Sequence, residues 1–383
     1  MGPVVRDGRP RHDIGDIVRQ QLPELEKRRV LTAQQLRVLL AVSRCRTAAL
    51  GGHMLVCDEC GYQHPVYNSC LDRHCPKCQA TAQEAWIAQR SERVLPVRHF
   101  HVVFTLPSEL RALASYSPRQ IYDALFRAAS TTLLELGISK YAAMLGITMI
   151  LHTWGRNMSL HPHVHAVVTA GGLSLDGKRW KPSSPKYLFS IKVMGQLLRG
   201  KMMACLRDLH AQGNFKGFDA FADPQAFDKL MARLARVSWV VYAKRPMPKV
   251  DHVLQYLGRY THRVAISNSR LLEVTDRSVT IATKHGKTLT LARGEFVRRF
   301  AQHVLPQSFH KIRHFGLYSG AAARPEGKLN LARASLCPQP SDDEDRQQPE
   351  EAVVTFAPPL CPNCGAELHR RPLPRGPPEA PVP

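Results

Sequence analysis

The 383-residue sequence lacks any apolar run near the ~18–20 residues that a membrane helix requires. No apolar segment follows the basic residues of the N-terminus, so we expect neither a secretory signal nor a membrane anchor. A phosphate-binding loop of the pattern G-x-x-x-x-G-K-[ST] is absent, which argues against chemistry driven by ATP. The sequence also lacks internal repeats beyond recurring C-x-x-C units.

Acidic residues are scarce relative to basic ones. The chain has 53 Lys and Arg against 31 Asp and Glu, a formal net charge of +22, and 44% of its residues are hydrophobic. This is a globular composition, but such an excess of one sign costs self-repulsion unless the usual partner is a polyanion. Nucleic acid is the commonest polyanion. We therefore expect a cytoplasmic, nucleoid-associated protein that binds nucleic acid.

Six of the ten cysteines fall between Cys45 and Cys78. Without a secretory context, this clustering indicates metal binding rather than disulfide bonds. Cys57-x-x-Cys60 followed by Cys75-x-x-Cys78 has the spacing in which two C-x-x-C turns hold one tetrahedral zinc. Four thiolates fill the coordination sphere of zinc, so we expect this site to be structural.

Other Cys and His residues allow a second zinc site with mixed ligands. Lone Cys and His residues are often simply packed, so the alternative is a structural role in the interior. The candidate ligands are Cys45, His53, Cys70 and His74. The pair Cys361-x-x-Cys364 needs two partners to bind a metal, and the nearest in sequence are Cys337 and His369.

Composition predicts four consecutive parts of the chain. We expect a flexible tail at 1–12 and a helical, zinc-binding domain at 13–95, which ends before Pro96. Residues 96–335 contain helical patterns and alternating strand patterns, which predict an α+β domain with a mostly antiparallel sheet. Residues 336–383 read as an acidic, Pro-rich tail that carries the CPNC pair.

Histidines occupy every second position of a predicted strand. Successive side chains of a strand point to opposite faces, so one face carries His161, His163 and His165. The residues between them are apolar and should face the core. Two such imidazoles can chelate one divalent cation. His99 and His101 form a second pair of the same kind, and spacing alone does not choose between the pairs.

Two tyrosines lie one turn apart on a helix that we predict over residues 250–260. Tyr256 and Tyr260 flank the apolar stripe of this helix rather than fill it. They are therefore either boundary residues with hydroxyls in water or reactive groups. Basic residues beside them that can bind phosphate are Arg259, His262 and Arg263.

Five motifs, in order between Arg44 and Gly316, resemble those of the rolling-circle transposases of the insertion sequence ninety-one family, members of the HUH endonuclease superfamily. The motifs are NSCLDRHCPKCQ, HVVFTLP, HPHVHAVVTAGG, YLGRYTHRVAIS and FVRRFAQHVLPQSFHKIRHFG. The resemblance implies a central antiparallel sheet that carries the metal-binding histidines, with the tyrosine helix packed beside it. It also implies that residues 96–335 are the catalytic domain.

The resemblance also implies the site residues. His163 and His165 match the metal pair, which selects them over His99 and His101, and Tyr256 and Tyr260 match the nucleophiles. The third metal ligand is not mapped, and the candidates for it are His152 and His161.

The implied chemistry is cleavage of single-stranded DNA. A Mg²⁺ or Mn²⁺ ion would polarise the phosphate, and a tyrosine would form a 5′-phosphotyrosine and release a 3′-OH. The implied partners are transposon ends, target DNA and host replication proteins.

The basic, aromatic-rich segment from 296 to 318 suits a groove that tracks the DNA backbone, although an amphipathic helix is the alternative. Its candidate DNA contacts are Arg298, Arg299, Lys311 and Arg313, with Phe300, Phe309 and Phe315 as stacking residues.

Two other functions remain open. A plasmid replication initiator or relaxase shares the chemistry, and a zinc-ribbon DNA-binding regulator would bind DNA without covalent attachment.

Overall fold

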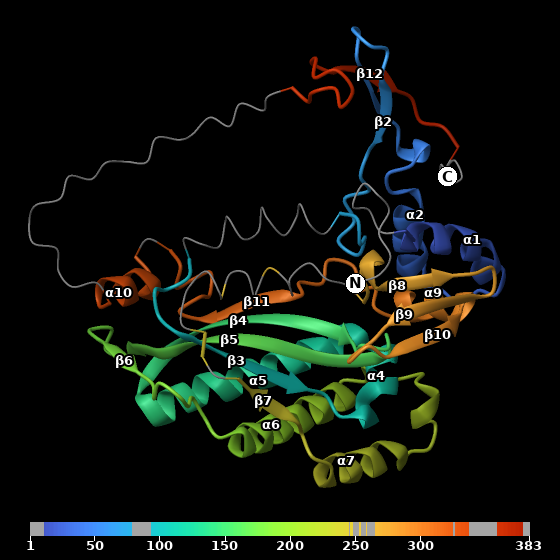
Figure 1. The fold of residues 1–383 in the computed structure, drawn as a ribbon. Helices are drawn as coiled ribbons and strands as arrows, with labels where there is room; N and C mark the ends of the chain where they lie inside the picture. The colour runs from blue at the N-terminus through green and yellow to red at the C-terminus, as the bar shows by residue number, and fades with distance from the viewer. Residues whose placement is uncertain are drawn as a thin grey trace, which may run out of the picture. The chain divides into compact units, whose positions relative to one another are not determined.

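In the computed structural model (Figure 1) the chain divides into two compact units, and each is described by itself. The first comprises Met1–Ala80, Ile266–Ala301 and Pro340–Pro383, and the second comprises Thr81–Ala265 and Gln302–Gln339. The structure describes residues 11–78, 93–244, 246–247, 253, 258, 265–324, 326–336 and 358–377.

This division differs from the consecutive domains expected from composition. Residues 266–301, expected in the catalytic domain, belong to the unit that contains the N-terminal cysteines. The described C-terminal residues 358–377, expected in a tail, belong to the same unit and include a strand. Strand pairing and helix packing between distant segments cause this difference, and local composition does not encode them.

Two capped helices open the first unit, α1 (Ile14–Lys27) and α2 (Ala33–Arg44). The Asp13 carboxylate accepts a hydrogen bond from the Gly15 amide at 2.8 Å, and Thr32 forms a capping box with Gln35. Helix α9 (Arg293–Ala301) packs against α1. It follows a three-stranded sheet of β8 (Leu271–Val274), β9 (Ser278–Ala282) and β10 (Thr288–Ala292).

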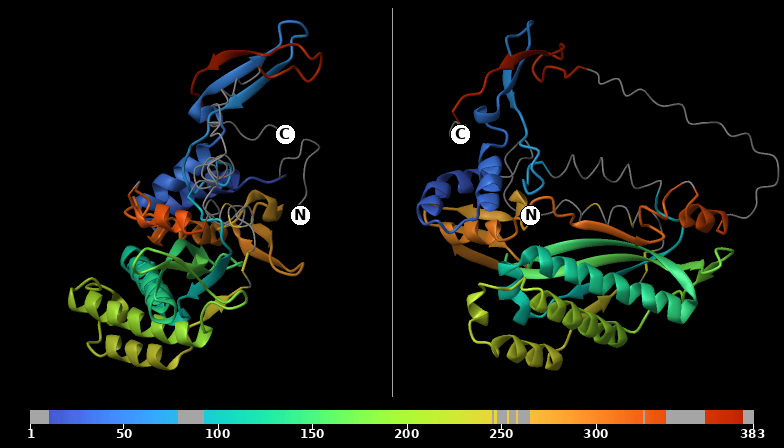
Figure 2. Two further views of the ribbon diagram at one scale, coloured as in Figure 1. Left: turned by 90° about the vertical axis from the view of Figure 1, so that its left-hand side faces the viewer. Right: turned by 180° about the vertical axis from the view of Figure 1, so that it is seen from behind.

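The first unit also contains an antiparallel ribbon of three strands in the order β12-β1-β2. Its strands are β1 (Gly52–Val56), β2 (Gln63–Tyr67) and β12 (His369–Leu373). Gly52 pairs with both Tyr67 and Leu373, so the C-terminal strand completes a sheet that the N-terminal hairpin begins. Figure 2 shows β12 beside the hairpin from two further sides.

The second unit is built on a six-stranded antiparallel sheet in the order β11-β4-β5-β3-β7, with β6 paired to β5. The bounds are β3 (His99–Thr105), β4 (Ala143–Trp154), β5 (Leu160–Ser174), β6 (Trp180–Pro182), β7 (Val241–Ala243) and β11 (Ile312–Gly316). The predicted α+β class with a central antiparallel sheet is confirmed, and β4 and β5 form an antiparallel pair.

Helices cover one face of this sheet (Figures 1 and 2). They are α4 (Arg111–Tyr116), α5 (Pro118–Tyr141), α6 (Ile191–Ala211) and α7 (Ala226–Arg236). Helix α5 begins at Pro118 and continues through Gly137 to a left-handed cap at Ala142. Gly137 is buried, and a Cβ there would lie 2.7 Å from Leu145 Cγ, so this glycine serves close packing rather than helix termination.

The remaining helical elements are short. They are α10 (Lys328–Ala334) and the 3₁₀ turns Ala48–Leu50, Ser108–Leu110, Asp219–Phe221 and Asn268–Arg270. Among the helices that the structure describes, none has both the length and the apolar character needed to cross a membrane.

Gly316 ends β11 with φ +59°, and a Cβ on it would lie 1.9 Å from the Leu145 carbonyl oxygen. We predict that Gly316→Ala lowers the free energy of unfolding by about 1–3 kcal/mol. An alanine would be strained in the left-handed backbone conformation, and its Cβ would overlap the carbonyl oxygen of Leu145. Urea denaturation followed by circular dichroism measures the loss. The matched control is Gly200→Ala in α6, where a Cβ meets nothing within 4 Å. An equal loss of stability in both variants would contradict the prediction.

Candidate functional site

The face of the central sheet opposite the helices carries a group of histidines. On β5, Val164, Ala166 and Val168 belong to the core beneath the helices, as the alternation predicts. His163 and His165 therefore point to the other face. The register of β4 and β5 places His152 directly across from His163, which adds a third imidazole from the neighbouring strand.

These three histidines, which we name the histidine centre, each offer one ring nitrogen, and these nitrogens all lie within 4.8 Å of one another. The ring centroids of His152 and His165 are 4.5 Å apart, and those of His163 and His165 are 4.9 Å apart. The ring of His161 lies 5.2 Å from that of His163 but is outside the group. Of the two residues considered as a third ligand, the structure thus brings His152 into the centre.

Burial favours the neutral form of two of these imidazoles, those of His163 and His165. Burial lowers the pKa of His163 to about 4. Burial, and then the nearby His152, lower the pKa of His165 still further. The Nδ1 of His163 lies 2.7 Å from the His161 carbonyl oxygen, which can only accept, so this nitrogen carries the proton and Nε2 keeps its lone pair. Neutral imidazoles with such lone pairs are the form that binds a divalent cation, so the donor set fits a metal ion.

The competing pair, His99 and His101, has other contacts. His99 hydrogen-bonds to the Val97 carbonyl through Nδ1 and to the Tyr318 hydroxyl through Nε2, at 2.8 and 2.7 Å. The Nε2 atom of His101 lies 2.9 Å from the Nδ1 atom of His165. Neither residue belongs to the histidine centre, but His101 touches one of its members and orients it. The i, i+2 pattern predicted the shared face but not this division of roles.

Lys244 is a basic residue near the centre that sequence reasoning missed. It is exposed just beyond β7, and its amide donates to the His101 carbonyl at 2.9 Å. After burial, its positive charge is the next cause that lowers the pKa of His101 to about 3. A lysine that acts on these histidines is also placed to attract a phosphate.

The predicted tyrosine helix is described only at Val253 and Gly258, which are both helical. Val253 is 1% exposed and packs with Ile150 and Val167, two residues that alternate with the core-facing positions of β4 and β5. This part of the helix thus lies against the histidine-bearing face, and the expected burial of Val253 is confirmed. The proposed nucleophiles and their basic neighbours lie outside the described residues: Tyr256, Arg259, Tyr260, His262 and Arg263.

The basic segment from 296 to 318 is divided between the two units. Arg298 and Arg299 lie on α9 in the first unit, and each forms an ion pair with Glu295 at 2.7 Å. Lys311 and Arg313 belong to the second unit. Phe300 and Phe309 are buried, at 0% and 1% exposure, so the prediction that they stack on DNA bases is wrong for this conformation.

Arg313 has partners within the protein. Its guanidinium pairs with Asp123 and lies 4.3 Å from the ring centroid of Phe126 and 4.9 Å from that of Phe309. Cation–π contacts of this kind stabilise the packing of β11 on α5. We therefore assign Arg313 to the fold first, because a phosphate would have to compete with these contacts.

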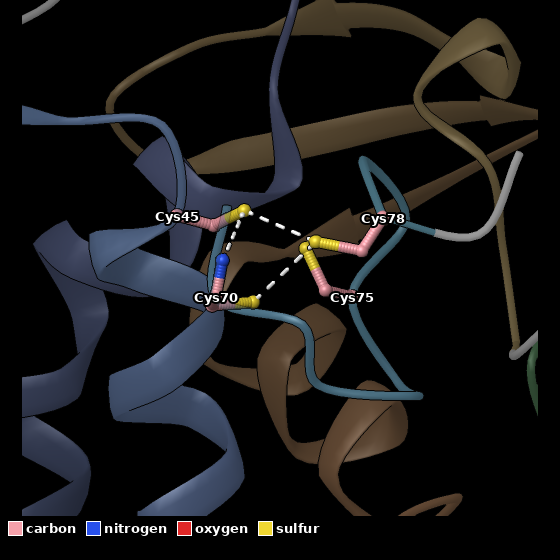
Figure 3. Close-up of side chains that lie close together, drawn as sticks. All are labelled: Cys45, Cys70, Cys75 and Cys78. Carbon is pink, nitrogen blue, oxygen red and sulfur yellow. Dashed lines mark hydrogen bonds between the residues drawn. The ribbon is translucent and has the colours of Figure 1, made fainter. Parts of the chain in front are cut away.

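Four cysteines close to α2 form one cluster, shown in Figure 3 with the sulfurs directed toward one another. We name it the N-terminal cysteine cluster, and its members are Cys45, Cys70, Cys75 and Cys78. The Sγ of Cys78 lies 3.5 Å from that of Cys45 and 3.7 Å from that of Cys70. The hydrogen bond with Cys70 lowers the pKa of the Cys45 thiol, which favours the thiolate that binds metal.

A second cluster, the terminal cysteine cluster, joins residues from the two ends of the chain. Its members are Cys57, Cys60, Cys361 and Cys364. The expected set of Cys57 and Cys60 with Cys75 and Cys78 is thus split between two clusters. The reason is that pairing of β12 with β1 brings the C-terminal cysteines to the turn between β1 and β2.

The two histidines of the expected mixed site are in neither cluster. His53 lies within β1, and the buried His74 hydrogen-bonds through Nδ1 to Asp72 at 2.8 Å. Cys45 and Cys70, expected beside them, belong to the N-terminal cysteine cluster instead.

Comparison with known proteins agrees with the family that the sequence motifs resemble. A family model described as "Putative transposase" matches residues 146–325, and one described as "Transposase zinc-binding domain" matches residues 17–106. "Putative transposase y4qJ" of Sinorhizobium fredii is 40% identical over 332 residues, which cover 84% of this chain and 83% of that protein. No solved structure matches the chain.

A second curated relative is "Transposase for insertion sequence element IS801" of Pseudomonas savastanoi pv. phaseolicola. It is 29% identical over 340 residues, which cover 85% of this chain and 80% of the relative. The first family model spans β4, β5 and β11, and the second spans α1, α2 and the N-terminal cysteine cluster. The chain therefore belongs to the insertion sequence ninety-one family of transposases.

Proposed function

We propose that this transposase cleaves and rejoins single-stranded DNA at transposon ends through a covalent 5′-phosphotyrosine, as rolling-circle transposition requires. The observation that carries the proposal is the histidine centre, in which three ring nitrogens lie within 4.8 Å on the sheet face that also buries Val253. Three imidazoles on two paired strands offer a donor set for a divalent cation. A purely structural role would not explain why these three imidazoles lie together.

The histidines would hold Mg²⁺ or Mn²⁺, which when bound stabilises negative charge on the oxygens of the scissile phosphate. His163 and His165 would bind through nitrogens that the strands hold in place, and His152 completes the set from β4. His101 would fix the ring of His165 through its 2.9 Å contact. Lys244 would attract the phosphate to this face.

We infer that Tyr256 and Tyr260 supply the nucleophile. They follow the buried Val253 by three and seven residues, so a continuous helix would keep both near the sheet face against which Val253 packs. A tyrosine hydroxyl oxygen attacks the phosphorus and loses its proton. The bond to the 3′ oxygen breaks, and this oxygen takes up a proton to leave as a 3′-OH. The new ester keeps the bond energy, so the reverse attack rejoins the strand.

A second tyrosine would allow a second cleavage while the first link persists, as transfer from donor to target demands. The net charge of +22 supports binding to the DNA backbone, with Arg259, His262 and Arg263 as candidate contacts near the tyrosines. The half-buried Lys311 and the α9 pair Arg298 and Arg299 remain candidates elsewhere. Host replication proteins would supply the strand synthesis that follows cleavage.

The N-terminal cysteine cluster would bind one structural zinc. Its four sulfurs fill a tetrahedral coordination sphere and leave no position for a substrate. The match to the transposase zinc-binding domain supports this assignment.

We predict that His152→Ala, His163→Ala and His165→Ala each lower cleavage of single-stranded DNA carrying the element end by about 10²–10³-fold. Binding of this DNA should change little, because basic surface rather than the metal supplies affinity. A denaturing gel in Mn²⁺ measures cleavage, and fluorescence anisotropy measures binding. His161→Ala is the matched control on the same strand and should retain cleavage. Loss of cleavage in His161→Ala with full activity in His152→Ala would overturn the assignment of the third ligand.

The double substitution Tyr256→Phe/Tyr260→Phe should abolish the covalent protein–DNA adduct, because phenylalanine keeps the ring but removes the hydroxyl. Each single variant should still form adduct yet fail to complete transposition in cells. Mass spectrometry of the DNA-linked protein detects the adduct. Tyr242→Phe, which removes an exposed hydroxyl on β7, serves as the control and should react normally. Adduct at the wild-type level in the double variant would identify another nucleophile.

We predict that Cys45→Ser/Cys70→Ser removes about one equivalent of zinc per chain, since two thiolates do not retain a structural zinc. Elemental analysis of the purified protein measures the metal. The control is Cys205→Ser in α6, which lies outside both cysteine clusters and should leave the zinc content unchanged. An unchanged zinc content in the double variant would exclude the N-terminal cysteine cluster as a zinc site.

A further inference from the structure

We propose that the terminal cysteine cluster is a second zinc site that clasps the C-terminal segment to the hairpin of β1 and β2. Cys57 and Cys60 lie in the turn of this hairpin, and Cys364 follows Cys57 by 307 residues. The zinc-binding family model ends at residue 106, so half of these ligands lie outside it. With this clasp, the ribbon would form only when the hairpin of β1 and β2 and the C-terminal segment are both present.

The two C-x-x-C turns have the same local geometry. Each is followed by a glycine in the left-handed region, Gly61 with φ +73° and Gly365 with φ +77°. The amide of each glycine donates to the carbonyl of the first cysteine of its turn, Cys57 or Cys361, at 3.0 and 2.9 Å. The amide of each first cysteine donates to the carbonyl five residues later, at 2.9 and 2.7 Å. Two unrelated segments thus form equivalent turns, each of which presents two thiols on one side.

The sulfurs of the two turns meet in crossed pairs. The Sγ atoms of Cys57 and Cys364 are 3.4 Å apart, and those of Cys60 and Cys361 are 3.5 Å apart. All four Sγ atoms lie within 4.8 Å of one another. Tetrahedral zinc with Zn–S bonds near 2.3 Å requires S···S separations of about 3.8 Å, so small shifts convert this arrangement into a complete site. Four thiolates in this geometry select zinc over a hard cation such as Mg²⁺.

The ribbon has little else to hold it together. The apolar cluster around the site has three buried members, Cys57, Cys361 and Leu368, two of which are proposed ligands. Four of the five residues of β12 are exposed, and within the described parts of the chain this strand pairs with β1 alone. Asp58 forms ion pairs with His369 and Arg371 at 3.5 and 3.4 Å, but all three side chains are exposed, and such pairs contribute little. A metal would supply the free energy that so small a core does not.

The first arm of the test counts zinc in the full-length protein by native mass spectrometry. We expect two zinc ions per chain in the wild type, one in Cys361→Ser/Cys364→Ser and two in the control Cys205→Ser. Comparison with Cys45→Ser/Cys70→Ser tells the two clusters apart, because each double variant should lose a different zinc. Two zinc ions in Cys361→Ser/Cys364→Ser, or only one in the wild type, would overturn the proposal. Metal content is independent of DNA cleavage, so this result stands whether or not the proposed chemistry is correct.

The second arm tests the clasp itself. A protease site inserted between residues 341 and 357, with a tag at the C-terminus, allows the chain to be cut after folding. We expect the C-terminal fragment to stay bound to the rest of the protein in gel filtration, and to separate in the Cys361→Ser/Cys364→Ser background or after zinc chelation. Separation of the wild-type fragment in the presence of zinc would exclude a clasp. Retention of the fragment in the Cys361→Ser/Cys364→Ser background would show that strand pairing, and not metal, holds it.

Discussion

The register between β4 and β5 is the constraint on which the histidine centre depends. These long antiparallel strands place His152 opposite His163 and Ile150 opposite His165. A slip of one residue would turn the histidines of β5 into the core and its valines outward. Packing of Val164, Ala166 and Val168 beneath the helices opposes such a slip, so the apolar side of β5 holds the polar side in position. An irregularity of the pairing lies directly after His152, between it and Trp154, a common feature of strands that carry functional side chains.

Burial of the histidines determines their chemistry. Removal of water lowers the pKa values of His163, His165 and His101, so the rings stay neutral near pH 7 and can donate lone pairs. Contacts within the protein also limit which histidines have a ring nitrogen available for a metal ion. His99 uses both ring nitrogens on Val97 and Tyr318, whereas His101 acts through His165. The two histidine pairs, on β3 and on β5, have similar sequence patterns but different contacts, because their neighbours in the fold differ.

The first unit contains a ribbon with few buried apolar residues. The apolar cluster of its ribbon is small, with Cys57, Cys361 and Leu368 as the buried members. The N-terminal cysteine cluster stands close to α2, where Lys77 donates to the Cys45 carbonyl at 2.6 Å and pairs with Asp13, the cap of α1. Helix capping and the cysteine loops are thus linked through one lysine.

Local pattern was sufficient for the features that depend on neighbouring residues. Alternation along β5 predicted its two faces, and the order of motifs predicted the transposase family. The pairing of distant segments could not be predicted in this way. Cys57 and Cys60 were expected beside Cys75 and Cys78 because they are close in sequence, but β12 brings Cys361 and Cys364 to them instead. His152 remained one of two candidates until strand register placed it opposite His163. Sequence periodicity indicates to which face of a strand or helix a side chain points. The neighbours of that side chain across the fold depend on hydrogen bonds and packing between residues far apart in the chain. Only the tertiary structure decides these neighbours.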